Sequence, residues 1–152
     1  MKLNTLTTGL IYPALLFAMF IALFVVPAFA EDISIDMLNK RDDGAKMVYS
    51  QDIARIDVGD TITWLPKSKG HNVEFVAGPD GWEAPKKSKN GKEVAITFDT
   101  PGIYLYQCTP HKSMGMIAIV VVGDDMSNLD AMTDMKMRGK SKKKMKALLA
   151  DL

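Results

Sequence analysis

The residues best suited to chemistry are one cysteine, two histidines and a methionine, most of them on one short segment. The run C-T-P-H-K-S-M-G-M begins at Cys108 and contains His111, while His71 lies well upstream. The chain has one Cys and two His, so this group includes every residue of those two types. One thiolate, two imidazoles and a weakly bound thioether form the donor set of a type 1 copper site, which passes single electrons. The sequence therefore predicts one copper ion held by His71, Cys108, His111 and either Met114 or Met116.

Each of these residues also has an ordinary structural alternative. A lone histidine often lies at the end of a surface strand, and methionines mostly fill apolar cores. Zinc also binds cysteine and histidine, but a thioether ligand suits copper better. A single cysteine in an oxidising compartment cannot form an internal disulfide, and an exposed thiol there is open to oxidation. The joint spacing of the four residues favours the copper site over these separate explanations.

Short strands between turn signals must position these side chains. Residues 33–37 alternate between apolar and polar types, and residues 116–122 are continuously apolar, as expected of a strand buried on both faces. Further strand-like runs cover residues 47–49, 54–56, 61–65, 71–76, 93–98 and 103–107. We expect an all-β sandwich of about seven or eight strands. In this arrangement one strand leads into Cys108, the next leaves the loop, and His71 begins a strand on the facing side.

The character of the chain changes after Gly123. Residues 124–152 lack strand alternation and are rich in Met, Lys, Ala and Leu at helical spacing. Ser127 or Asn128 could cap a first helix, and Gly139 separates it from a second. We therefore expect a single domain over residues 31–152, with the β-sandwich at 31–123 and a two-helix extension at 124–152.

The first 30 residues have the pattern of a secretory signal peptide. Lys2 is followed by an apolar run over residues 9–26 and by the small-residue cleavage pattern Ala28-Phe29-Ala30. The alternative is an uncleaved anchor, because about 20 apolar residues can cross a bilayer. We expect export to the periplasm, cleavage after residue 30, and no stable membrane association of the mature chain.

The charge distribution indicates less about function than the ligand pattern does. The chain has 19 Lys and Arg against 18 Asp and Glu, and Lys2 leaves with the predicted signal peptide. The basic residues concentrate in residues 126–152, which is too little to indicate nucleic-acid binding. Surface lysines generally serve solubility, but a ring of them can steer an acidic partner. The C-terminal lysines could also contact anionic membranes.

Five segments of residues 31–152 resemble the cupredoxins, and among them most closely the pseudoazurins. These segments are E-D-I-S-I-D-M-L-N-K, V-G-D-T-I-T-W-L-P, K-G-H-N-V-E, P-G-I-Y-L-Y-Q-C-T-P-H-K-S-M-G-M-I-A and V-G-D-D-M-S-N-L-D. The resemblance implies a Greek-key cupredoxin β-sandwich with two C-terminal α-helices, and it favours Met116 over Met114 as the axial ligand. Plastocyanins share the loop spacing but lack the two helices.

The resemblance also implies roles for residues around the ligands. Asn72 is expected to tie the two ligand loops together and to aim its backbone N–H at the Cys108 sulfur, and Met47 is expected to pack near His111. Pro110 is expected to stiffen the ligand loop and to border the exposed histidine. An apolar docking patch ringed by lysines is expected at Pro110, Met114, Gly115, Lys40, Lys69 and Lys112. Relatives often carry Lys before the ligand cysteine, whereas this chain has Gln107, which weakens the ring at that point.

The function that follows is a periplasmic one-electron carrier rather than an enzyme. The resemblance implies redox protein partners, with electrons passing from a cytochrome donor such as a c-type cytochrome to a denitrification enzyme such as nitrite reductase. We expect a monomer that binds no nucleic acid. The alternative is a copper-delivery protein, because the chain has 11 Met, including Met132, Met135 and Met137. A multicopper enzyme is excluded, since its additional copper centres need more than two histidines.

Overall fold

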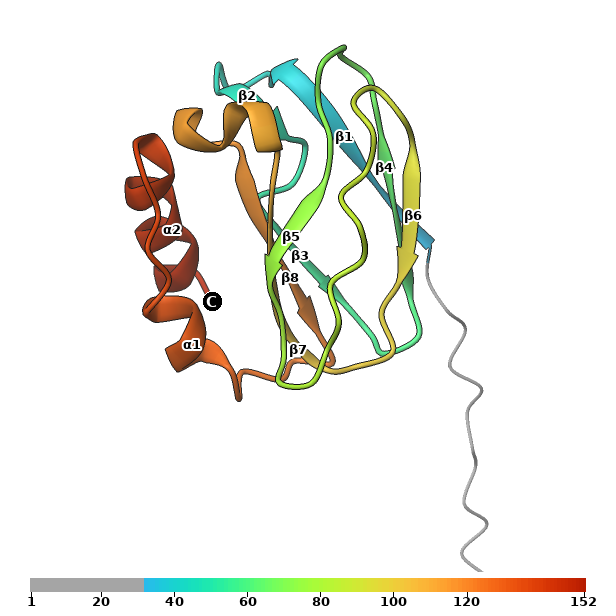
Figure 1. Ribbon diagram of the computed structural model, residues 1–152, viewed down its shortest axis with the longest axis vertical. Coiled ribbons are helices and arrows are strands. Elements are labelled where there is room, and N and C mark those ends of the chain that lie inside the picture. Colours follow the sequence, from blue (N-terminus) through green and yellow to red (C-terminus); the bar gives the residue numbers. More distant parts are fainter. Residues whose placement is uncertain (1–31) are drawn as a thin grey trace, which may run out of the picture.

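Two four-stranded sheets pack face to face in the computed structural model, which describes residues 32–152 (Figure 1). The first sheet has the order β2 (Lys46–Tyr49), β1 (Asp32–Lys40), β4 (Thr61–Leu65), β6 (Val94–Thr97). The second has the order β3 (Ile53–Ile56), β8 (Ile117–Val122), β7 (Gly102–Gln107), β5 (Glu74–Ala77). The pairs β1–β4 and β3–β8 are parallel, and all other neighbours are antiparallel. The predicted all-β sandwich with two C-terminal helices is confirmed.

The two central strands of the second sheet explain the long apolar runs in the sequence. Every residue of β7 and β8 is buried. Alternate residues such as Tyr104, Tyr106 and Val120 face the other sheet, whereas Ile103 and Ile119 belong to a second cluster under the helices. Because both faces of these strands are covered, both sets of side chains are apolar. This layer therefore holds rigidly the loop that connects β7 to β8.

Two α-helices, α1 (Leu129–Thr133) and α2 (Lys140–Ala150), cover the outer face of the second sheet (Figure 1). A 3₁₀ helix, η1 (Thr109–Met114), lies in the β7–β8 connection at one end of the sandwich. Met132, Met145 and Leu148 are buried between α1, α2 and the sheet. None of the helices within residues 32–152 has the length and apolar character needed to cross a bilayer.

The start of α2 is fitted closely against η1. Gly139 has φ 59°, and a Cβ at this position would collide with the carbonyl oxygen of Ser113. The Ser141 hydroxyl, which is buried, donates a hydrogen bond to the carbonyl oxygen of Lys112. Only glycine tolerates both the left-handed backbone and the close approach, so Gly139 allows the extension to touch the β7–β8 connection.

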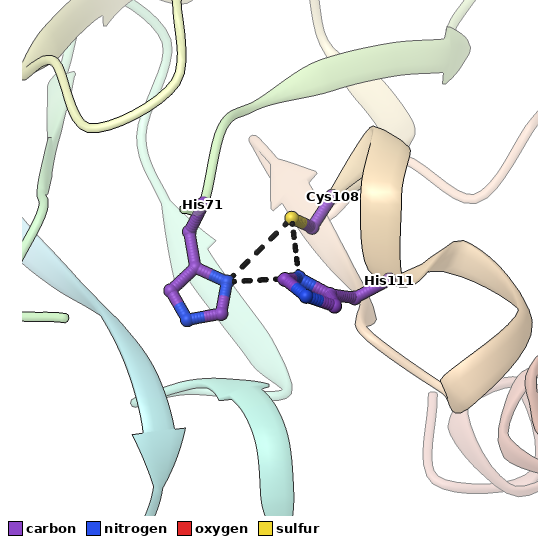
Figure 2. Close-up of side chains that lie close together, drawn as sticks. All are labelled: His71, Cys108 and His111. Carbon is purple, nitrogen blue, oxygen red and sulfur yellow. Dashed lines mark hydrogen bonds between the residues drawn. The ribbon is translucent and has the colours of Figure 1, made fainter. Parts of the chain in front are cut away.

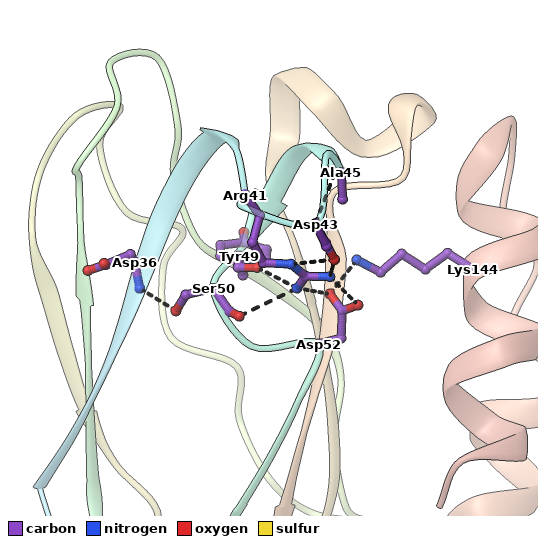
Figure 3. A network of polar contacts seen from close by, with 8 residues as sticks. All are labelled: Asp36, Arg41, Asp43, Ala45, Tyr49, Ser50, Asp52 and Lys144. Carbon is purple, nitrogen blue, oxygen red and sulfur yellow. Dashed lines mark hydrogen bonds and ion pairs between the residues drawn. The ribbon is translucent and has the colours of Figure 1, made fainter.

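A polar cluster fastens α2 to the sandwich (Figure 3). Lys144 on α2 places its Nζ 2.7 Å from Oδ1 of Asp52, and an Arg41 guanidinium nitrogen lies 3.2 Å from the same oxygen. Burial alone would raise the pKa of Asp52, but the hydrogen bonds from Lys144 and Arg41 outweigh it and hold that pKa below its usual value. The cluster therefore stabilises the docked helix while Asp52 is ionised.

Two local predictions are wrong. Residues 71–73 are not in a strand, since β5 begins at Glu74, so His71 lies on the segment that precedes the strand. Asn128 occupies the N-cap of α1, but its side chain does not cap the helix. Instead it accepts a hydrogen bond from the N–H of Ile103 at 2.9 Å and donates one to that residue's carbonyl at 2.8 Å. These bonds fix the start of α1 to the beginning of β7.

Candidate metal centre

A thiol and two imidazoles converge at one end of the sandwich (Figure 2). Cys108 Sγ lies 3.3 Å from Nδ1 of His111 and 3.7 Å from Nδ1 of His71. The two Nδ1 atoms are 3.1 Å apart. One ligand atom from each of the three residues falls within 4.8 Å of the others. The segment before β5 therefore meets the loop after β7, although the residues are far apart in sequence.

Backbone hydrogen bonds close the loop that carries two of these residues. Cys108 follows β7 directly, and its N–H donates to the carbonyl oxygen of Met116 at 2.9 Å. The N–H of His111 donates to the carbonyl oxygen of Cys108 at 3.0 Å. Pro110 lies in the first turn of η1, and Gly115 reverses the chain with φ 101°. These bonds therefore hold Cys108, His111 and Met116 in fixed relation to one another.

A hydrogen bond to the far side of the ring sets the orientation of His71. Its Nε2 lies 2.8 Å from Oδ1 of Asn39, at the end of β1. An amide oxygen only accepts, so Nε2–H is the donor and Nδ1 carries the free lone pair. Metal-binding histidines are commonly oriented in this way by a partner on the other ring nitrogen. Asn39 therefore directs the lone pair of Nδ1 toward Cys108 and His111.

The electrostatics of the cluster favour a shared cation. Burial, and then the neighbouring His111, lower the pKa of His71, which favours the neutral imidazole that metals bind. Burial raises the pKa of the Cys108 thiol, although the backbone N–H groups of Asn72 and His111 act in the opposite direction. A buried thiol of this kind becomes a thiolate when a metal ion supplies the compensating charge.

Asn72 joins the two ligand segments through a hydrogen-bond network. Its Oδ1 accepts from the N–H of Thr109 at 2.8 Å, and its Nδ2 donates to Oγ1 of Thr109 at 3.0 Å. Oε2 of Glu74 accepts from that hydroxyl at 3.0 Å and from Nε2 of Gln107 at 2.8 Å. Burial acts to raise the pKa of Glu74, but these two hydrogen bonds lower it overall. The network connects both residues that flank Cys108 to β5, which lies beside β7 in the same sheet and not on the facing side as the sequence predicted.

The donor set fits copper. A thiolate and two imidazoles suit both oxidation states of copper, which when bound would accept and release one electron. Met116 is fully buried, directly after the loop, whereas the side chain of Met114 is 44% exposed. This difference supports Met116 rather than Met114 as the thioether ligand, and the assignment stays a prediction.

Met47 and the six predicted docking residues differ in their exposure. Met47 has φ 51° and packs against the apolar cluster that includes Cys108 and Met116. The exposed residues among the predicted docking set are Pro110, Met114, Lys40, Lys69 and Lys112. Gly115 does not fit an exposed patch, because it is buried and its Cα hydrogen faces Lys140 of α2, where an added Cβ would lie 3.5 Å from the lysine Cβ. We therefore exclude Gly115 from the docking surface.

Sequence reasoning missed two residues of the site. Asn39 appears in the sequence only as a polar residue near the end of a strand, and Glu74 only as the residue after the H-N-V segment. Both reach the site through contacts between residues that are distant in sequence, for which no local pattern exists. Only the spatial arrangement identifies them.

Comparisons with known proteins agree with this site. A family model described as copper binding proteins of the plastocyanin/azurin family matches residues 35–123. The chain is 37% identical to pseudoazurin of Methylorubrum extorquens, over 94% of this chain and 99% of that one. It is 41% identical to pseudoazurin of Paracoccus pantotrophus, over 83% and 87% of the two chains.

Solved structures give the same result. The crystal structure of pseudoazurin from Methylobacterium extorquens AM1 matches with a TM-score of 0.74 and 38% identity, covering 80% of this chain and 98% of that one. That match extends over the sandwich and the helical extension and confirms the predicted Greek-key cupredoxin fold. The chain therefore belongs to the plastocyanin/azurin family of copper-binding proteins, and within it to the pseudoazurins, which are carriers of single electrons with one copper ion per chain.

Proposed function

We propose that this protein is a periplasmic carrier that takes single electrons from a cytochrome donor, such as a c-type cytochrome, and delivers them to a denitrification enzyme, most directly nitrite reductase. The observation that carries the proposal is the convergence of Cys108, His71 and His111 on a closed loop of a cupredoxin sandwich. Family membership supports a carrier rather than an enzyme. The copper ligands are His71, Cys108, His111 and Met116.

Electrons enter and leave through His111. Cys108, His71 and Met116 are all fully buried, whereas His111 is partly exposed on η1. Pro110 and Met114 are exposed on the same short helix. A small apolar contact of this kind, around a partly exposed ligand, suits transient electron-transfer complexes. Docking at η1 brings the partner closest to the copper site.

Exposed lysines around this end would steer an acidic partner. Lys40 ends β1, Lys69 lies in the connection between β4 and β5, and Lys112 lies on η1 itself. Opposite charge on a partner raises the rate of encounter more than the final affinity, so the effect falls as salt increases. Gln107 contributes no charge here, because its side chain is a neutral amide, and it is buried and donates a hydrogen bond to Glu74.

Residues 1–30 direct the export of the protein in this proposal. They act as a signal peptide that is removed, which leaves residues 31–152 as a single-domain, monomeric carrier in the periplasm. Fractionation of cells that produce the full chain, with mass spectrometry of the N-terminus, tests this directly. A chain that begins at Glu31 in the periplasmic fraction supports the proposal, and an uncleaved chain in the membrane fraction contradicts it.

The positions of the methionines favour the carrier over the alternative function, copper delivery. Met132 is fully buried and Met145 is 4% exposed, and Met135 and Met137 pack against the same cluster. These side chains therefore serve the packing of the extension. A delivery protein would bind additional exchangeable copper(I), whereas the carrier binds one copper ion that cycles reversibly.

A matched pair of variants tests docking at η1. Met114 is 44% exposed and Val58 is 48% exposed, and Val58 contacts Gly123 beyond the far end of β8. Met114→Glu should slow the second-order oxidation of the copper(I) protein by nitrite reductase about tenfold, because it buries a charge in an apolar contact. Val58→Glu adds the same charge and should change the rate less than about twofold. Equal rates for the two variants, or no transfer by the wild type, would contradict the proposal.

A further inference from the structure

A groove runs along the helical extension, between α2 and the segment that connects it to α1. Its volume is about 1220 Å³. Met135, Met137 and Leu149 form its half-buried apolar floor, above the buried Met145. Flexible methionines adapt to the shape of a bound side chain, which is why they are frequent at protein-binding surfaces. The groove can therefore accept an apolar side chain from outside.

The rim of the groove is strongly cationic. It includes one acidic residue, Asp134, and five exposed basic residues, namely Lys136, Arg138, Lys142, Lys143 and Lys146. None of these five forms an ion pair with another residue in the part of the chain that the structure describes, in contrast to Lys144, which binds Asp52. Five cations without acidic partners around an apolar floor are complementary to a segment that carries both carboxylates and an apolar anchor.

The groove is continuous with the surface of the metal-binding loop. Lys136, Met137 and Arg138 also line a neighbouring pocket of about 280 Å³, whose other wall includes Lys112 and Ser113 of η1. The contact of Gly139 with Ser113 holds the two regions together. A partner that docks at η1 could therefore contact the groove at the same time.

Two other occupants fit less well. Copper(I) favours thioethers, but five surrounding cations repel a metal cation. An anionic bilayer would meet the lysines, but a membrane surface cannot enter a groove to cover its apolar floor. An acidic protein segment that also carries an apolar side chain can contact both the apolar floor and the basic rim.

We propose that the groove lined by Met135, Met137 and Leu149 and ringed by basic residues is a second docking site, which binds an acidic segment with an apolar anchor on the redox partner. The proposal rests on the carrier function and adds to it a contact that fixes the rotational orientation of the partner on η1. The contact at η1 brings the partner to His111, and the groove on the extension selects the partner by charge.

A peptide titration tests the groove without requiring electron transfer. The ¹⁵N-labelled copper(I) form of residues 31–152 is titrated with a synthetic peptide of alternating Glu and Leu, and separately with its Gln and Leu counterpart. We expect shifts at Met135, Met137 and Leu149 with the acidic peptide alone. The variant Lys142→Glu/Lys146→Glu should weaken binding about tenfold, and Lys86→Glu/Lys92→Glu, with the same net charge on an exposed loop, less than about twofold.

The possible outcomes test binding in the groove independently of the carrier function. Shifts confined to the groove and lost only in Lys142→Glu/Lys146→Glu support the proposal, even where nitrite reductase accepts no electron. Equal weakening by both double variants, or shifts spread over all lysines, overturns it in favour of unspecific charge attraction. Groove shifts with phosphatidylglycerol vesicles and none with the peptide overturn it in favour of membrane binding. Normal electron transfer without peptide binding overturns the groove alone.

Discussion

Asn72→Ala offers the sharpest test of how the site is held together. The side chain is 3% exposed and makes three hydrogen bonds, to the N–H and Oγ1 of Thr109 and to the carbonyl of Ser88. The truncation leaves the N–H of Thr109 without its acceptor at a partly buried position, which costs about 1–3 kcal/mol, and removes two bonds worth about 1 kcal/mol each. We expect a loss of about 3–5 kcal/mol in the free energy of unfolding, or roughly 15 °C in Tm.

Urea and thermal unfolding of the copper-free protein measure this loss, so that metal binding does not mask it. Asn90→Ala, at an exposed asparagine of the neighbouring loop, is the matched control and should change the unfolding free energy by less than about 0.5 kcal/mol. Thr109→Val completes a double-mutant cycle, in which the two residues should be coupled by about 1 kcal/mol or more. Additive effects, or a change for Asn72→Ala as small as that of the control, would refute the proposed link between the loops.

Three further predictions follow from single contacts. Asn39→Ala removes the acceptor that orients His71, and it should lower copper affinity about 10–100-fold in competition with a chelator; an unchanged affinity would contradict that role. The folded-state pKa of Asp52 is depressed, so its stabilisation is complete above about pH 4 and is lost as the pH falls. Asp52→Asn should therefore flatten the decrease of unfolding free energy in acid, and an unaltered pH profile would count against the cluster. Gly139→Ala should destabilise the protein by at least about 1 kcal/mol more than Gly91→Ala, which has φ 68° but open space around it; equal losses in urea unfolding would show that the close contact at Gly139 is unimportant.

Local sequence patterns determine much of this fold. The alternation in residues 33–37 and the continuous apolar run in residues 116–122 correspond to β1 and β8 in the structure. The proximity of Cys108 and His111 could be predicted because the one cysteine of the chain and a histidine lie three residues apart on one loop. The change in composition after Gly123 was enough to indicate the two helices, α1 and α2.

Long-range contacts account for what the sequence did not predict. His71 is preceded by a turn and held by Asn39 rather than by a strand, and this depends on β1 lying beside it. Asn128 has a side chain suited to capping a helix, but the backbone of Ile103 competes for it successfully. Gly115 is covered by a helix that begins 25 residues later in the chain, at Lys140. None of these partners can be inferred from residues nearby in sequence.

The most direct measurement is the visible absorption spectrum of residues 31–152 loaded with copper(II), together with metal analysis. We expect one copper ion per chain and an intense thiolate-to-copper band, which disappears on mild reduction and returns on oxidation. Cys108→Ser, which keeps the loop but removes the thiolate, should abolish the band. A colourless wild-type protein, or one that binds several copper(I) ions, would show that His71, Cys108, His111 and Met116 do not form one redox-active copper site.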